Sequence, residues 1–275
     1  MTNGTAEIGF GCREGITRLT HLYQRDPLRV LFPTPAAGDP LLAVLVTTSG
    51  GLVAGDRLDI GVRLAENAVA HVTASAAEKV YRSLGPTTEI RQSLSVATGA
   101  ALEFLPLETI LFDGARLWRE TTVELGSGAL FLGGDIVVLG RRARGEGFTR
   151  GFLREVWQVR HDGRLVWGDA LHVEGDIAGI INNPACFDGA AAFATMILAP
   201  AGQDPRRFLD CARKVQSAGA TDRVQCGVTA TVGLVIARWL ATDAAALRKA
   251  YANLASHLRR EALGLPPSLP RLWHV

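Results

Sequence analysis

SLSVATGAALEFL, residues 93–105, has the pattern of an apolar strand, a short turn that ends in alanine, and a second apolar strand. The same pattern occurs in VRLAENAVAHVTA at 62–74 and in TVELGSGALFLGG at 122–134. Apolar and β-branched residues alternate with polar residues in these segments, and Gly-Ala or Asn-Ala marks the turns, which indicates pairs of β-strands. The chain therefore contains a weak internal repeat of strand pairs.

The spacing of this repeat predicts the architecture. The turn alanines are Ala68, Ala100 and Ala129, so the units follow one another at intervals of 32 and then 29 residues. Repeats of this length are typical of stacked units, each of which buries a face against its neighbour. We expect a mostly β fold, a stacked or β-helix-like sheet assembly with a few helices. A conventional β-sandwich is the alternative.

Helices are expected chiefly in the C-terminal third of the chain. Residues 204–219, DPRRFLDCARKVQSAG, have an aspartate cap and a proline in the first turn, and the predicted helix ends at Gly219. Residues 224–240, VQCGVTATVGLVIARWL, are predicted to form a strand. Earlier in the chain, Asp162-Gly163 lies between alternating apolar runs and predicts a β-hairpin.

A second helix is expected between a cap at Thr242 or Asp243 and a stop at Gly264. It carries an apolar stripe at helical spacing, followed by the tail PPSLPRLWHV. The stripe and the tail tryptophan comprise Leu247, Tyr251, Leu254, Leu258 and Trp273. Packing of the stripe on the sheet is the favoured interpretation, and contact with a partner protein is the alternative.

Three carboxylates, Glu103, Glu108 and Asp113, stand five residues apart in the mostly apolar segment LEFLPLETILFDGAR, 102–116. Because side chains in a strand alternate between its faces, Glu108 would share the more apolar face, unless Pro106 resets the alternation. A buried carboxylate is costly unless it is paired, hydrogen-bonded or bound to a metal. Glu108 is therefore the first candidate for a specific role.

A charged cluster follows each repeat: AAEKVYRS at 76–83, LETILFDGAR at 107–116 and GRRARGEGF at 140–148. If the units stack in register, the clusters meet along one edge and can supply a cationic partner for Glu108. The candidate partners are Arg82, Arg116 and Arg141. The alternative is three separate solvated loops.

Composition excludes several classes of protein. The chain of 275 residues is 48% hydrophobic with a net charge of +2, which favours a globular protein and gives no indication of a nucleic-acid or membrane partner. The four cysteines lack the spacing of a zinc site, the N-terminus lacks the pattern of a signal peptide, and the longest apolar run is too short to span a bilayer. We expect a cytoplasmic protein with reduced thiols.

Sequence motifs for catalysis are also missing. The glycine-rich stretch TSGGLVAGDRL, residues 48–58, has no phosphate-binding lysine, so it is predicted to be a turn between strands. Asp56 is predicted either to cap this turn or to belong to a functional site, and capping is the favoured interpretation. No Gly-x-Ser-x-Gly segment is present. The carboxylates at 103, 108 and 113 leave open a β-helix polysaccharide hydrolase or lyase. Against this alternative, saccharide clefts usually need exposed aromatic side chains, and this chain is only 7% aromatic with no obvious aromatic stripe.

Several motifs, in order along the chain, resemble the UreD (UreH) family of urease accessory proteins. They are TRLTHLYQRDPLRVLFP, TSGGLVAGD, AAEKVYRS, LEFLPLETILFDGARL, LGRRARGEGF and PRLW. The resemblance extends from about Gly15 to Trp273, with fewer matching motifs between 175 and 245. It implies one domain over residues 1–275, a mostly β fold and a chaperone without enzymatic activity.

The resemblance also implies partners and a cargo. Proteins of this family help to insert nickel into apo-urease together with UreF and the GTPase UreG, and they are thought to guide nickel through an internal passage. No tightly bound cofactor is expected, and nickel would be bound only transiently, because sparse oxygen ligands let the ion leave.

Charged residues in these motifs are the candidates for the nickel passage or an internal polar network. They are Asp56, Glu78, Arg82, Glu103, Glu108, Asp113, Arg141 and Glu146. For Glu108 two interpretations stay open: it lines a polar passage, or it pairs with an arginine and holds the repeats in register. The candidate contacts with a helical partner such as UreF are Tyr251, Leu254, Leu258 and Trp273.

Overall fold

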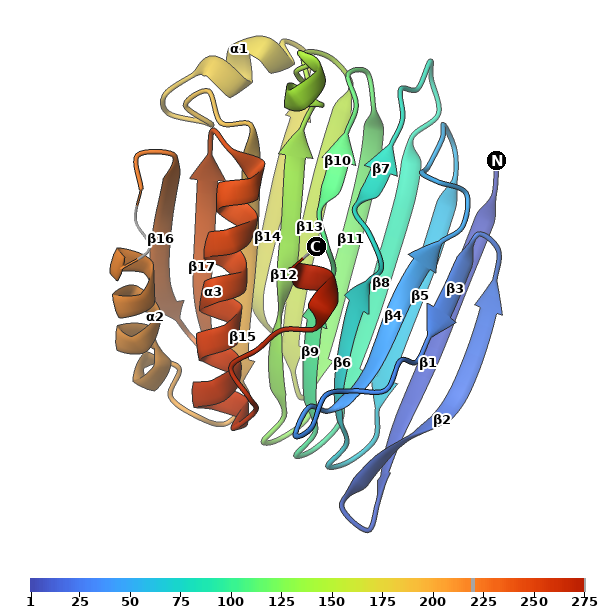
Figure 1. Cartoon of the computed structure of the whole chain (residues 1–275), viewed down its shortest axis with the longest axis vertical. Helices are drawn as coiled ribbons and strands as arrows, with labels where there is room; N and C mark the ends of the chain where they lie inside the picture. The colour runs from blue at the N-terminus through green and yellow to red at the C-terminus, as the bar shows by residue number, and fades with distance from the viewer. Residues whose placement is uncertain (219–220, 275) are drawn as a thin grey trace.

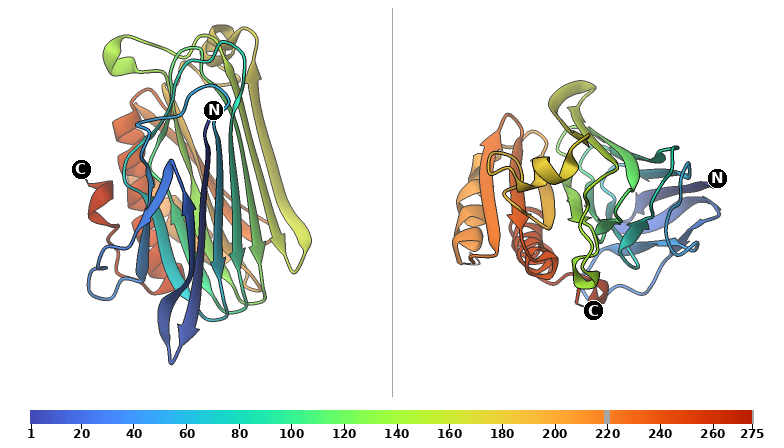
Figure 2. Two further views of the ribbon diagram at one scale, coloured as in Figure 1. Left: turned by 90° about the vertical axis from the view of Figure 1, so that its right-hand side faces the viewer. Right: turned by 90° about the horizontal axis from the view of Figure 1, so that it is seen from above.

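Two β-sheets face each other, and helices cover the outer side of one of them (Figures 1 and 2). The computed structural model describes residues 1–218 and 221–274. The first sheet has seven strands in the order β14-β13-β11-β8-β5-β1-β2. Their bounds, in that order, are Arg164–Glu174, Phe152–His161, Arg116–Leu125, Thr88–Val96, Arg57–Leu64, Asn3–Arg13 and Ile16–Arg25.

The second sheet has ten strands, with the main order β16-β17-β15-β12-β9-β6-β4-β3 and with β10 and β7 attached beside β12. The bounds of the main strands, in that order, are Val224–Thr231, Leu234–Ala241, Ala192–Pro200, Leu130–Leu139, Ala101–Leu105, Val69–Ala74, Leu41–Thr47 and Leu28–Leu31. The two attached strands are β10, Thr109–Leu111, and β7, Glu78–Val80.

The chain alternates between the sheets, as the repeat predicted. From β5 it turns into β6, returns to β8, turns into β9, returns to β11 and turns into β12. Strands β5, β8 and β11 pair in parallel in the first sheet, and β6, β9 and β12 pair in parallel in the second. The stacked, coiled β-architecture is therefore confirmed.

The three turn alanines stack on one another. Ala68 accepts a backbone hydrogen bond from Ala101 at 2.9 Å, and Ala100 accepts one from Leu130 at 2.9 Å. Ala129 continues the column with a bond from Ala201 at 2.8 Å. The alanines are buried, so a larger side chain would separate adjacent coils, which explains the small residue at the end of each turn.

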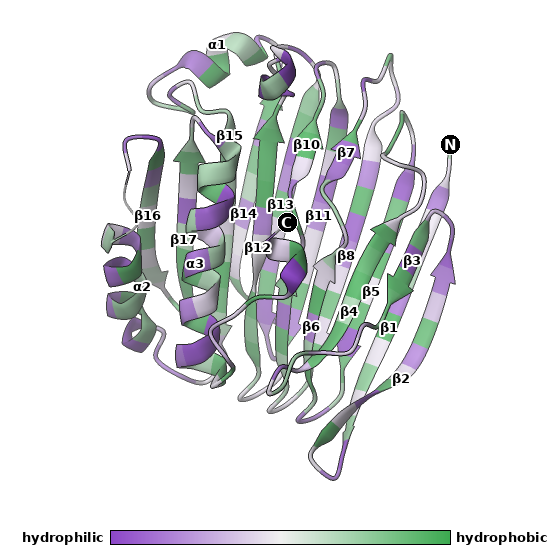
Figure 3. Cartoon of the chain, viewed as in Figure 1, coloured by the Kyte–Doolittle hydropathy of each residue, from purple (hydrophilic) through white to green (hydrophobic). Residues whose placement is uncertain are grey.

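Both faces of the second sheet are buried. One apolar core lies between the sheets and includes Phe104 and Phe131, and the other lies between the second sheet and the C-terminal helices and includes Leu132 and Tyr251. Every residue of β12 is buried, and this strand is almost continuously apolar in Figure 3. The outer face of the first sheet is partly exposed, so β5 and β8 alternate buried and less buried residues.

The helices are α1, Ile177–Asn182; α2, Arg206–Ala218; and α3, Ala244–Leu263. Short 3₁₀ turns occupy Arg142–Arg144 and Arg271–Trp273. Asp243 caps α3 by accepting bonds from the amides of Ala245 and Ala246, and Gly264 ends the helix with φ of 67°. The predicted end of α2 at Gly219 lies outside the described residues.

The apolar stripe of α3 packs on the second sheet. Tyr251 contacts Trp239 of β17 and stacks on Trp273 with ring centroids 5.7 Å apart. The four predicted partner contacts, Tyr251, Leu254, Leu258 and Trp273, are at most 4% exposed. Packing on the sheet is thus the observed role, and these side chains are not available on the surface of this chain.

The predicted hairpin at Asp162-Gly163 connects β13 and β14, and both residues have positive φ, 48° and 74°. The prediction of a single strand over 224–240 is wrong. Residues there form the hairpin β16–β17, with Gly233 at φ of 82° in the turn. The Val-Gly pair at 232–233 is a weak turn signal inside a strongly apolar run.

Among residues 1–218 and 221–274, no helix is both long and apolar enough to cross a membrane.

Gly134 in β12 should be intolerant of a side chain. A methyl group there would overlap the carbonyl oxygen of Thr195 in β15 and lie 2.8 Å from the hydroxyl of Tyr251. We expect Gly134→Ala to lower the free energy of unfolding by about 1–3 kcal/mol or more, measured by urea denaturation. Gly168→Ala in β14, where no neighbour lies closer than 3.8 Å, is the control. Equal stability of the two variants would contradict the close approach of β15 and Tyr251 to Gly134.

Candidate functional site

A belt of polar side chains crosses the apolar space between the sheets. The belt, called the interior polar belt below, consists of Gln92, Thr109, Arg119, Thr121, Asp135 and Glu155. All six residues are buried, although they come from five different strands. Because the flanking positions in the same alternation phase, such as Leu117, Val123 and Leu153, hold apolar side chains of the core between the sheets, the belt is an interruption that requires an explanation.

Arg119 is the centre of the belt. Its Nε and Nη2 atoms donate to Oε2 of Glu155 at 3.1 and 2.8 Å, and its Nη1 atom donates to Oγ1 of Thr109 at 2.9 Å. The same Nη1 atom lies 3.2 Å from Oδ1 of Asp135. Farther along, Thr121 donates to Gln92 at 2.8 Å. One guanidinium group therefore faces two buried carboxyl groups.

These carboxyl groups are incompletely hydrogen-bonded. Oδ2 of Asp135 and Oε1 of Glu155 accept no hydrogen bond, and Oδ1 of Asp135 has only the ion pair with Arg119. Burial raises the pKa of Glu155 to about 7 and raises the pKa of Asp135, and Arg119 only partly offsets this effect. Burial alone would lower the pKa of Arg119, but the two carboxyl groups outweigh it, so the guanidinium stays charged.

Two cavities end at this belt. A cavity of about 710 Å³ lies beside the edge strand β14, and its lining includes Asp135, Glu155 and Trp157. A smaller cavity of about 140 Å³ is lined by Arg119, Thr109 and Gln92. Since Arg119 contacts both Thr109 and Glu155, its guanidinium group lies between the two cavities.

The belt was missed by the sequence predictions, although a signal exists. In β11, Arg119 and Thr121 occupy the same alternation phase as Leu117 and Val123, so the apolar face of the strand contains two polar residues. Asp135 interrupts the otherwise apolar β12. A polar residue in the buried phase of a strand is the pattern to look for, but only the fold shows that these residues meet.

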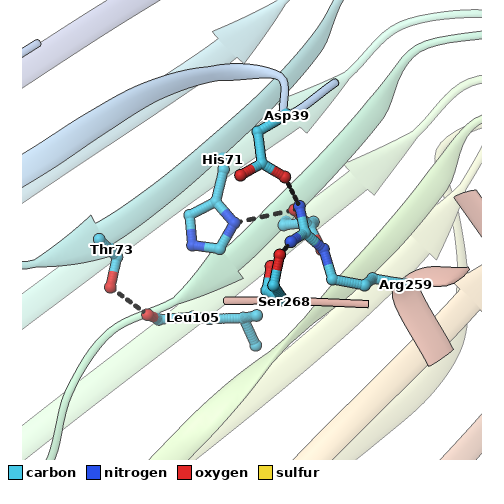
Figure 4. Close-up of polar contacts among 7 residues, drawn as sticks. Asp39, His71, Thr73, Leu105, Arg259 and Ser268 are labelled. Atoms are coloured by element: carbon cyan, nitrogen blue, oxygen red, sulfur yellow. Dashed lines mark hydrogen bonds and ion pairs between the residues drawn. The ribbon is translucent and has the colours of Figure 1, made fainter. Parts of the chain in front are cut away.

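Glu103 is the most buried of the predicted carboxylates, contrary to the predicted alternation. It has 0% exposure and points toward α3, where Arg259 donates to both of its oxygens at 2.9 and 3.1 Å. His71 donates to Oε2 at 2.8 Å. Figure 4 shows that Arg259 also reaches Asp39 and the carbonyl oxygen of Ser268. The prediction failed because helix α3 buries the face that was expected to be less apolar.

This network ties the C-terminal helix to the stacked strands. Burial alone would raise the pKa of Glu103, but the charges and hydrogen bonds of His71 and Arg259 outweigh it and lower the pKa. Every oxygen of Glu103 has a partner, which distinguishes it from the carboxyl groups of the interior polar belt. Glu103 therefore has the environment of a structural ion pair.

Glu108 is also buried, with 8% exposure, but its partner differs from those predicted. It lies 3.5 Å from Nε of Arg248 in α3, not beside Arg82, Arg116 or Arg141. Its side chain thus faces the C-terminal helix, and its carbonyl oxygen accepts a bond from the amide of Glu78. The proline at 106 ends the alternation of β9, so the phase of that strand does not extend to Glu108.

The charged clusters after the repeats meet at one end of the sheets, as the stacked arrangement predicted. Glu146 accepts from the amide of Asp113 and from Arg141, whose guanidinium lies over the ring of Phe112. Asp113 accepts from the amide and hydroxyl of Thr149, both at 2.8 Å. The alternative of three separate solvated loops is wrong, because these side chains connect the loops.

The remaining predicted residues have distinct positions. Asp56 caps its turn by accepting from the amide of Val53 at 3.0 Å, and it also holds the amide of Thr2 at 2.7 Å. Arg82 forms an isolated bridge with Ala115. Of the eight predicted residues, Glu78 alone lines either of the two interior cavities.

No three His, Cys, Asp or Glu side chains gather closely enough to hold a metal ion in the part of the chain that the structure describes. The interior polar belt offers two carboxyl groups, which suits weak and reversible binding of a cation.

Comparison with known proteins assigns the family. Residues 2–274 match the UreD urease accessory protein family. The chain belongs to this family.

Individual relatives match this chain over most of their length. A urease accessory protein UreD from Magnetococcus marinus is 43% identical, covering 99% of this chain and 94% of the relative. A protein of the same name from Methylobacterium sp. strain 4-46 is 39% identical, covering 100% of this chain and 95% of the relative. Another from Rhodopseudomonas palustris strain BisA53 is 37% identical, covering 97% of this chain and 89% of the relative. The resemblance to the UreD family found in the motifs is thereby confirmed.

The Glu103 network should make the stability of this UreD-family chain depend on pH. Because the folded-state pKa of Glu103 lies below 4.5, the ionised carboxylate stabilises the fold above about pH 4.5. This contribution is lost as the pH falls through the folded-state pKa. We expect Glu103→Gln to be less stable than the wild type at pH 7 and to lose less stability on acidification, measured by urea unfolding at a series of pH values. Exposed Glu66→Gln is the control, and a parallel loss in wild type and Glu103→Gln would contradict the assignment.

Proposed function

We propose that this chain is a urease maturation factor, a chaperone that works with UreF and the GTPase UreG to deliver nickel into apo-urease in the cytoplasm. Membership of the UreD urease accessory protein family supports the role in urease maturation. The proposed partners follow from the family resemblance, and the absence of a phosphate-loop motif is consistent with GTP hydrolysis by a partner.

The single observation that carries the nickel passage is the interior polar belt with a cavity on either side. A cation moving through an apolar sandwich needs oxygen ligands, since an unpaired charge is costly to bury. Asp135 and Glu155 supply such oxygens at the inner end of the larger cavity, and Glu78 lines the smaller one. The proposed route therefore runs between the sheets, through both cavities, rather than past Glu108.

The alternative function, a polysaccharide hydrolase or lyase, has less support from the geometry. Glu103 is held by Arg259 and His71, Glu108 by Arg248, and Asp113 by Thr149. None of these three carboxylates lines the larger or the smaller interior cavity. Purified chain that degrades a polysaccharide would nevertheless favour this alternative.

Complementation tests the proposal. In cells with a urease gene cluster that lacks only its own UreD, we expect wild-type chain to restore urease activity and the nickel content of urease. We expect Asp135→Asn/Glu155→Gln to reduce the nickel content by about tenfold, because two ionisable ligands become neutral amides, and tenfold corresponds to about 1.4 kcal/mol. Because these substitutions leave the buried guanidinium group of Arg119 without an anionic partner, the solubility and circular dichroism of the double variant are measured in parallel, and a folded double variant is required for the comparison.

The matched control is Glu120→Gln, which removes a carboxylate from the other face of β11 and should leave nickel loading unchanged. The chain and UreF are quantified in the same cultures. Failure of the wild type despite soluble complex would refute the function. Normal nickel loading by the double variant would refute the route.

A further inference from the structure

A pocket of about 270 Å³ lies at the end of the sheets that is uppermost in Figure 1. It shares no lining residue with the two cavities between the sheets. Three of its lining residues are charged, and all three are arginines: Arg82, Arg116 and Arg150. The pocket, called the arginine pocket below, therefore offers positive charge from several sides and has no acidic side chain in its lining.

Three consecutive coils of the stack supply these arginines, and the backbone holds them together. Arg82 follows β7 and forms a bridge with Ala115, the neighbour of Arg116 at the start of β11. The carbonyl oxygen of Arg150, which precedes β13, accepts a bond from the amide of Gly114 at 2.9 Å. The convergence of the three side chains is thus fixed by the same register that stacks the coils.

Two glycines allow these segments to approach so closely. A methyl group at Gly114, where φ is 82°, would lie 2.8 Å from Cγ of Arg82. A methyl group at Gly151, where φ is 132°, would lie 2.1 Å from the carbonyl oxygen of Ala115. Both glycines line the pocket, and both conformations favour glycine. A larger residue at either position would push the arginine-bearing segments apart.

The three arginines are only partly compensated by carboxylates. Arg116 lies 3.4 Å from Oε1 of Glu174, and its Nε atom is buried without a hydrogen-bond partner. The Nε atom of Arg150 lies 3.1 Å from Oδ2 of Asp113. Arg82 forms no ion pair within the described part of the chain. A buried donor without a partner costs free energy, so its retention indicates an acceptor that this chain does not itself supply.

The loops around the arginine pocket concentrate positive charge. Segments 81–87, 112–116 and 140–151 together contain six arginines and two acidic residues, which gives a net charge of +4. The whole chain has a net charge of +2, so the remainder is slightly negative. A local excess of one sign of charge raises the local concentration of ions of the opposite sign. The ligand of this pocket is therefore an anion.

The number and directions of the arginines indicate the class of anion. Guanidinium groups match the oxygens of both carboxylates and phosphates. A carboxylate presents two oxygens in one plane, whereas a phosphate group presents its oxygens in tetrahedral directions and can be contacted by arginines on different sides. A phosphate monoester also carries a charge of about −1.5 to −2 at pH 7, which suits three guanidinium groups that share two carboxylates.

We propose that Arg82, Arg116 and Arg150 form a binding site for a phosphate group, either inorganic phosphate or a phosphate monoester. Arg82 has no carboxylate partner to give up, so it contributes most to the affinity. The other two arginines donate from nitrogen atoms that their carboxylates leave free. The site goes beyond the proposed function and does not depend on it, because the arginine pocket is separate from the interior cavities.

Phosphate binding to the purified full chain tests the site. The probe is radiolabelled inorganic phosphate in equilibrium dialysis at pH 7.5 and low ionic strength, in a buffer free of other oxyanions. We expect the wild type to bind one phosphate per chain and Arg82→Gln to bind it about tenfold more weakly, because a charged hydrogen-bond donor is lost. Absence of saturable binding by the wild type would overturn the proposal.

A matched variant controls for general electrostatic attraction. Arg144→Gln, in the 3₁₀ turn at the same end of the sheets, removes the same charge from a residue that does not line the pocket. We expect it to keep most of the wild-type affinity. Equal weakening by Arg82→Gln and Arg144→Gln would show diffuse attraction to a basic surface and would overturn the site.

The folding of the variants is checked by circular dichroism. Arg82→Gln leaves no carboxylate without its partner and is expected to fold. If it does not, Arg82→Lys replaces it, since lysine keeps the charge but lacks the planar fork of the guanidinium group. Unchanged affinity of Arg82→Lys would then contradict the proposed contact.

Competitors identify the ligand. Displacement of the labelled phosphate by glycerol 3-phosphate would assign the site to an esterified phosphate, and displacement by unlabelled inorganic phosphate alone would assign it to the free ion. Acetate that competes as well as phosphate would overturn the choice of a phosphate group. Because binding is measured on the purified chain, failure of the wild type to restore urease activation would refute the proposed function without changing this result.

Discussion

The backbone hydrogen bonds between successive turns are the constraint on which the rest of the structure depends. Ala68, Ala100 and Ala129 each accept a bond from the next coil, and this column fixes the register of all parallel strands beside it. Since side chains in a strand alternate with a period of two, a shift by one residue would exchange the buried and exposed faces of a whole strand. The register thus determines that Arg119, Asp135 and Glu155, which are far apart in the sequence, meet between the sheets.

The structure contains two buried ionic networks, which differ in how many of their carboxyl oxygens have a hydrogen-bond or ion-pair partner. In the Glu103 network both carboxylate oxygens are bonded, by Arg259 and His71, and the result is a rigid connection between the C-terminal helix and the sheet. In the interior polar belt one guanidinium serves two carboxyl groups, and Oδ2 of Asp135 and Oε1 of Glu155 have neither a hydrogen bond nor an ion pair. A fully paired network suits a structural role, whereas an incompletely paired one next to a cavity suits a ligand that comes and goes. This difference, rather than burial or charge alone, distinguishes scaffold from candidate site.

A stacked β-architecture provides suitable walls for such a site. Strands of two sheets hold the belt residues at fixed positions without a flexible loop. Helix α3 covers the second sheet from outside and frees its inner face for the belt. The family assignment gives this arrangement a biological setting, because the chain belongs to a family of urease accessory proteins.

The sequence by itself determined the elements whose signals are local or repeated. The turn alanines at 68, 100 and 129 predicted the stacked strands, Asp243 and Gly264 bounded the last helix, and the ordered motifs indicated the family. Only the tertiary structure decided the environments of the charged residues. Alternation within one strand cannot show whether a second face is covered, so Glu103 was assigned to the wrong environment and Arg248 was not recognised as the partner of Glu108. The belt escaped prediction for the same reason: its members are separated by up to 63 residues between Gln92 and Glu155, and their contact depends on the packing of two sheets.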